Sequence, residues 1–103
     1  MLALALGACL APTLPIPPPS DMVASPPDAN GMVTIKGGPG SARVGGWVNA
    51  CNETDGCHAS VGSDVASDGS WQLAPTPGKS KDRFRVWQEL GLERGEQGWV
   101  DVP

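Results

Sequence analysis

The alternation of hydrophobic and polar residues changes character at about residue 31. From there to residue 103, short hydrophobic runs are interrupted by Gly and Pro, and no stretch has helical spacing long enough to form a helix. This pattern predicts strands at residues 32–36, 42–50, 59–66, 70–74, 83–90 and 98–102. Regularly spaced short strands with turns between them are typical of a small antiparallel sandwich or barrel. We therefore predict one all-β domain over residues 31–103.

A first hairpin is predicted around the turn Ser67-Asp68-Gly69. Gly69 can adopt the left-handed conformation that a three-residue turn requires, because it has no Cβ. Alternation along the two strands then places one set of hydrophobic residues on a common face, which we assign to the core. This set is Val61, Val65, Trp71 and Leu73.

The last two strands form the second predicted hairpin. Phe84 and Val86 alternate with Arg85 and Trp87, so the first two point inward and the other two outward. A turn through residues 91–95 brings the final strand back beside this one, and slipping by one residue would expose the valines to water. The predicted pairs are Trp87 with Trp99, Arg85 with Asp101, and Val86 with Val100.

Residues 42–50 add a third outward tryptophan. Val44 and Val48 share one face of this strand, which leaves Trp47 on the other. Clustered exposed indoles stack on sugar rings and fill protein interfaces, so they mark a candidate binding surface. That surface consists of Trp47, Trp87, Trp99 and Arg85. In the alternative interpretation, one indole covers a sheet edge and the other two only stabilise their hairpin.

The N-terminal segment has the composition of an export signal. Residues 1–8 are apolar or small and lead directly into Cys9, and prolines soon after exclude a membrane-spanning helix. Leu6-Gly7-Ala8-Cys9 resembles the lipobox of bacterial lipoproteins, and the resemblance implies that Cys9 carries the lipid and begins the mature chain. The usual basic segment before the apolar run is missing, which suggests a natural start further upstream. The alternative is a short apolar tail with a chance cysteine.

Residues 9–30 are rich in Pro, Ala and Ser. Such a composition favours an extended, disordered linker, and polyproline II rises about 3.1 Å per residue. We predict that residues 1–8 are a signal remnant and that residues 9–30 are a stalk between a membrane anchor and the domain.

The cysteine count is odd, and acylation of Cys9 would leave Cys51 and Cys57 as a pair. Six residues apart in a polar loop, these two can close a disulfide, which stabilises a small domain by about 2 kcal/mol. The alternative is a zinc site with His58 as a third ligand, but its cysteine spacing is unusual and exported thiols oxidise. We predict the disulfide, with no metal and no cofactor.

Three segments together carry a family resemblance. They are residues 42–50 (ARVGGWVNA), residues 67–73 (SDGSWQL) and residues 100–103 (VDVP). They look like bacterial Ig-like repeats and carboxypeptidase-regulatory-like domains. The resemblance implies an Ig-like or prealbumin-like sandwich used as a spacer, adhesive module or binding module, with no active site.

Catalytic motifs are not found in the sequence. His58 is the only histidine, no serine lies in a G-x-S-x-G motif, and the net charge of −4 disfavours binding to nucleic acid. We therefore predict a non-enzymatic lipoprotein of the bacterial cell envelope, or a secreted protein, that acts as a structural, spacer or protein-interaction module. The alternative function is a carbohydrate-binding module that uses the outward tryptophans. The partners expected are the membrane and a protein or glycan at the cell surface.

Overall fold

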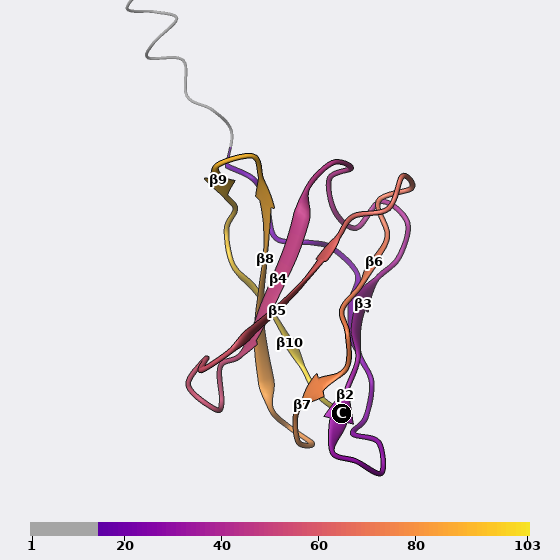
Figure 1. Ribbon diagram of the computed structural model, residues 1–103, viewed down its shortest axis with the longest axis vertical. Coiled ribbons are helices and arrows are strands. Elements are labelled where there is room, and N and C mark those ends of the chain that lie inside the picture. Colours follow the sequence, from indigo (N-terminus) through magenta and orange to yellow (C-terminus); the bar gives the residue numbers. More distant parts are fainter. Residues whose placement is uncertain (1–14) are drawn as a thin grey trace, which may run out of the picture.

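The computed structural model describes residues 15–103 as two layers of antiparallel strands (Figure 1). The larger sheet has the strand order β10–β8–β4–β5, and β9 also pairs with β8. Its strands are β4 (Trp47–Asn52), β5 (Ser60–Asp64), β8 (Arg83–Leu90), β9 (Glu93–Arg94) and β10 (Gly98–Asp101). Strand β8 lies at the centre of this sheet, where it pairs with three neighbours.

The opposite layer consists of two smaller sheets. One has the order β1–β3–β6, and β2 pairs with β7 in the other. Their strands are β1 (Met22–Ala24), β2 (Met32–Val33), β3 (Ile35–Gly37), β6 (Trp71–Gln72) and β7 (Thr76–Pro77). Only Thr34 separates β2 from β3, so the two small sheets follow one another along the chain. The predicted all-β antiparallel sandwich is confirmed, and residues 15–103 include no helix long and apolar enough to cross a membrane.

The core lies between the two layers. Phe84 and Val86 of β8 point into it, as the alternation predicts, and Val33 and Ile35 meet them from the other layer. The turn of the first predicted hairpin is confirmed: Gly69 has a φ of 87°, and the amide of residue 66 donates to the carbonyl of residue 70. The pairing of its two strands was predicted wrongly, because β5 belongs to the larger sheet and β6 to the opposite layer, so the chain crosses between the layers at this turn. Its predicted core face is buried at Val65, Trp71 and Leu73 and partly buried at Val61.

Part of the predicted linker belongs to the folded domain instead. Residues 22–24 form β1, which pairs with β3, and Ile16 is only 4% exposed. The reason is that hydrophobic residues lie between the proline runs, and the sheet supplies hydrogen-bond partners that composition does not reveal. The boundary predicted at residue 31 therefore moves towards the N-terminus. The predicted signal remnant, residues 1–8, and Cys9 lie outside the described residues.

Strand β4 begins five residues later than predicted. Gly45 has a φ of 86°, and the amide of Gly46 donates to the carbonyl of Arg43, so a turn occupies these positions. The turn interrupts the alternation that would have placed Val44 beside Val48. Val48 is fully buried, whereas Val44 is 59% exposed, so the prediction of a shared core face was wrong for Val44.

The register predicted for the last hairpin was also wrong, by two residues. Gly98 pairs with Val86, so Trp99 lies opposite Arg85 rather than opposite Trp87. The turn itself is tighter than predicted: Leu90 pairs with Glu93, and a bulge follows in which the four residues 95–98 lie opposite only three residues of β8, 86–88. Because the shift is an even number, every side chain keeps its predicted face.

Candidate binding face

The three tryptophans predicted to point outward gather on one face of the larger sheet. We call this surface the outer face: it is the side of β4, β8 and β10 opposite to their core residues Val48 and Val86. Trp47 is 40% exposed and Trp99 is 50% exposed. Two of the three predicted indoles are therefore open to solvent on this face.

Trp87 lies on the outer face but is only 7% exposed. The prediction that its indole is part of an exposed binding surface was therefore wrong. The Arg94 guanidinium carbon of β9 lies 4.2 Å from the centroid of its ring, a cation–π contact. Its indole N–H donates to Glu89 Oε2 at 3.0 Å. The tight β8–β9 turn brings Arg94 into this position. The sequence predicted a wider turn, so this contact was not expected.

A hydrogen-bond network links Trp47 to Trp87 across the outer face. Trp47 Nε1 donates to Asn49 Oδ1 at 3.0 Å, and Asn49 Nδ2 donates to Glu89 Oε2 at 2.8 Å. The same Glu89 oxygen accepts from the Trp87 indole. The Trp47 ring also lies over Gly62 of β5, where any Cβ would overlap Nε1. These contacts hold Trp47 in one orientation.

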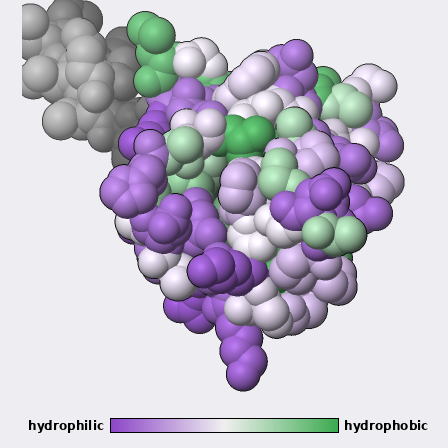
Figure 2. Space-filling model, turned by 60° about the horizontal axis from the view of Figure 1, so that its bottom comes forward, coloured by the Kyte–Doolittle hydropathy of each residue, from purple (hydrophilic) through white to green (hydrophobic). Residues whose placement is uncertain are grey.

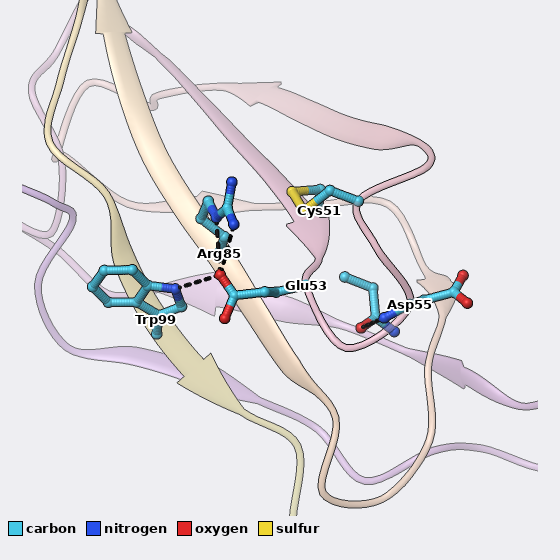
Figure 3. Close-up of a disulfide and its surroundings, with 7 residues drawn as sticks. Cys51, Glu53, Asp55, Arg85 and Trp99 are labelled. Carbon is cyan, nitrogen blue, oxygen red and sulfur yellow. Dashed lines mark hydrogen bonds and ion pairs between the residues drawn. A yellow bond between two sulfur atoms is a disulfide. The ribbon is translucent and has the colours of Figure 1, made fainter.

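The second exposed indole belongs to a separate cluster beside the disulfide (Figure 3). Glu53 Oε1 accepts from Trp99 Nε1 at 3.0 Å and from Arg85 Nε and Nη2 at 3.0 and 2.8 Å. In Figure 3 the Glu53 side chain reaches from the loop across β8 to β10, whereas Asp55 points away. This carboxylate is therefore the centre that positions both Arg85 and Trp99.

Sequence reasoning missed Glu53, although the charge of an outward Arg85 called for a carboxylate nearby. Asp101 was the predicted partner of Arg85. Because of the register shift, Asp101 pairs with Arg83 instead, and Arg83 Nε lies 2.9 Å from Asp101 Oδ1. The predicted Cys51–Cys57 disulfide is confirmed. Its ring encloses Glu53, whose amide donates to the carbonyl of Arg83 and fastens the loop to β8.

The hydrogen bond from Trp99, followed by that from Arg85, holds the pKa of Glu53 below its ordinary value of 4.5. The donors favour the charged form of the carboxylate. In the same way, the hydrogen bond from Arg83 lowers the pKa of Asp101. Glu53 and Asp101 therefore stay charged and paired on the outer face at neutral pH.

Glu53→Gln should lower the melting temperature at neutral pH but not in acid. Folding lowers the pKa of Glu53, so its stabilising effect is complete above the unfolded-state value near 4.5 and is lost as the pH falls through the folded-state value. Melting curves of the natural chain and the variant, recorded from neutral pH to well below 4.5, should converge at the acid end. A difference that stays constant over this range would contradict the assigned role of the carboxylate.

The side of the molecule drawn in Figure 2 is mostly polar. Figure 2 shows the hydrophobic side chains on one side of the molecule scattered in small groups among polar ones. Within residues 15–103, no group of three or more His, Cys, Asp or Glu side chains is placed to hold a metal ion. His58, the third ligand of the alternative zinc site, is exposed beside the disulfide loop.

Comparison with known proteins adds no relative: no family model, curated sequence or solved structure matches the chain.

Proposed function

We propose that this chain is a non-enzymatic module of the bacterial cell envelope, held at the membrane by a lipid on Cys9 and acting through contacts with a protein partner. One observation carries the binding part of the proposal. Trp47 and Trp99, from strands on either side of β8, are both exposed on the outer face. Exposed tryptophans are frequent energetic centres of protein interfaces.

The fixed orientation of the two indoles supports this function. Asn49 and Glu53 already accept the hydrogen bonds of the two indole N–H groups, so the ring surfaces are what a partner meets. A side chain that is ordered before binding loses little conformational entropy when the complex forms. The outer face is therefore suited to docking without rearrangement.

The folded N-terminal segment changes the kind of tether that we propose. Six residues lead from Cys9 to Pro15, the first described residue, and an extended chain of this length spans at most about 20 Å. This is much shorter than the stalk predicted from composition. A lipid on Cys9 would hold the domain close to the membrane surface, where it could dock or space other envelope components.

The anchor is tested on the chain isolated from the membrane fraction of the bacterium that produces it. Mass spectrometry should find a mature chain that begins at Cys9 and carries a diacylglycerol there. Cys9→Ser should remain unprocessed and leave the membrane fraction. An unmodified Cys9 within an unprocessed chain would refute the anchor and leave the binding face unaffected.

A carbohydrate-binding module is the second candidate, because indole rings stack on sugars. Trp47 and Trp99 lie at positions opposite Glu89 and Arg85, four residues apart along β8. Strand spacing and rise separate these positions by about 10 Å across the sheet and about 13 Å along it. One sugar ring could not cover both indoles, so an oligosaccharide would be the ligand.

Calorimetric titration with neutral oligosaccharides of increasing length separates the two candidates. For a carbohydrate-binding module, affinity should rise with length, and Trp47→Ala and Trp99→Ala should each weaken it about 2- to 10-fold. Leu92→Ala is the matched control, because Leu92 is fully exposed and belongs to the β8–β9 turn. Absence of binding, or equal effects of all three variants, would exclude the carbohydrate alternative.

A further inference from the structure

Strand β5 forms an open edge of the larger sheet. It pairs with β4 on one side, and no strand among residues 15–103 pairs with its other side. Val65 N donates to the carbonyl of Gly46 at 3.2 Å, just beyond the end of the β4–β5 ladder. In an antiparallel ladder the bonded residues alternate, so residues 61 and 63 bond to β4. The backbone N–H and C=O groups of Ser60, Gly62 and Asp64 therefore point away from the sheet.

This edge has few of the features that usually prevent pairing with another strand: within residues 60–64, Asp64 alone is charged. Edge strands are commonly protected by Lys, Pro or a bulge, whereas residues 60–64 read SVGSD and pair with β4 without interruption. Open space also lies beside the Asp64 end of the strand. A hollow of about 430 Å³ there is lined by Lys36, Gly37, Ser63, Asp64, Ala66, Ser70, Trp71 and Gln72.

We propose that β5 pairs antiparallel with β5 of a second copy of this chain, around a twofold axis at Gly62. In this register Gly62 faces Gly62, and Ser60 of each copy faces Asp64 of the other. All three residues with outward backbone groups then form hydrogen-bonded pairs. No like charges face each other, because each carboxylate lies opposite a hydroxyl. The edge is thus complementary to itself.

Trp47 adds a hydrophobic contribution to the same contact. Its ring lies over Gly62 and is 40% exposed. Since Gly62 has no side chain, the two Trp47 rings can approach each other above the paired strands. Burial and contact of two indoles stabilise an interface beyond the backbone hydrogen bonds.

The hollow also has a role in this arrangement. Beyond Ser60, the chain of the second copy continues through Ala59 and His58. With the same register, these residues run past Asp64 towards Ala66, which lines the hollow. The dimer would join the two larger sheets into one, with both outer faces on the same side. This inference does not depend on the lipid anchor. It uses the Trp47 rings for the contact between copies, which leaves Trp99 as the exposed indole available to another partner.

Sedimentation velocity over a wide range of concentration tests the dimer on the full chain carrying Cys9→Ser, which prevents joining of copies through the free thiol. We expect a monomer–dimer equilibrium. Ser60→Lys places an ammonium group opposite Asp64 at two places in the dimer and should lower the dissociation constant of the dimer roughly 2- to 30-fold. Ser60→Asp should raise this constant by a similar factor. Adding Asp64→Lys to Ser60→Lys should remove the gain.

The matched controls are Leu92→Lys and Leu92→Asp, which introduce the same charges at a fully exposed residue of the β8–β9 turn, away from β5. They should leave the dissociation constant unchanged, and circular dichroism should show that all variants fold. A chain that stays monomeric at every concentration would overturn the proposal. So would a dimer that responds equally to the changes at residues 60 and 92.

Discussion

Phe84→Ala should lower the free energy of unfolding by about 3–5 kcal/mol, the largest effect we expect of a single substitution. Phe84 is 1% exposed and lies on the central strand β8, between the two layers. Removing the ring loses its burial and leaves a cavity that the surrounding strands can fill only in part. Since small domains are usually stable by only about 5–15 kcal/mol, much of the total stability would be lost. Urea denaturation followed by tryptophan fluorescence measures the change.

Leu92→Ala is the control for this experiment. It removes hydrophobic volume from a residue that is fully exposed, so its effect should stay within about 0.5 kcal/mol. Similar losses for the two variants would show that the ring of Phe84 is not in the core.

Removing the disulfide should have the second-largest effect. Cys51→Ser with Cys57→Ser should lower the free energy of unfolding by about 2 kcal/mol, because the unfolded chain regains the entropy that the short ring restricts. The loop also carries Glu53, which holds Trp99. The double variant should therefore show increased accessibility of Trp99 to a fluorescence quencher, even where the domain remains folded.

Glu53→Gln with the disulfide intact distinguishes the two contributions. It should increase the quenching of Trp99 without the full loss of stability. If the double variant were as stable as the natural chain, the disulfide would not be the staple of this small domain. If its quenching were unchanged, the loop would not need the disulfide to position Glu53.

Strand β8 shows what sequence patterns predict well in this chain. Phe84 and Val86 alternate with Arg85 and Trp87, and all four lie on the faces predicted for them. Gly69 was likewise predicted in its left-handed turn. Both predictions depend on local geometry, because the period of a strand and the absence of a Cβ do not change with the rest of the fold.

The candidate site was predictable only in part. The outward direction of the three tryptophans follows from alternation, but burial of Trp87 depends on Arg94, which reaches it because the turn is three residues shorter than expected. Glu53 was missed for a similar reason. Its contacts with Arg85 and Trp99 join a loop to two strands that are distant in sequence.

The amino-acid sequence alone was enough to predict an all-β sandwich, the Cys51–Cys57 pair and the face of each indole, since these depend on periodicity and on short separations along the chain. The register of the last hairpin, the boundaries of the strands and the exposure of the tryptophans could be determined only from the folded structure. Strand β1 forms within a proline-rich segment because β3 offers its backbone a partner, and a shorter turn followed by a bulge shifts the register of the last hairpin. Such features arise from hydrogen bonds and packing between residues far apart in sequence, which no local pattern records.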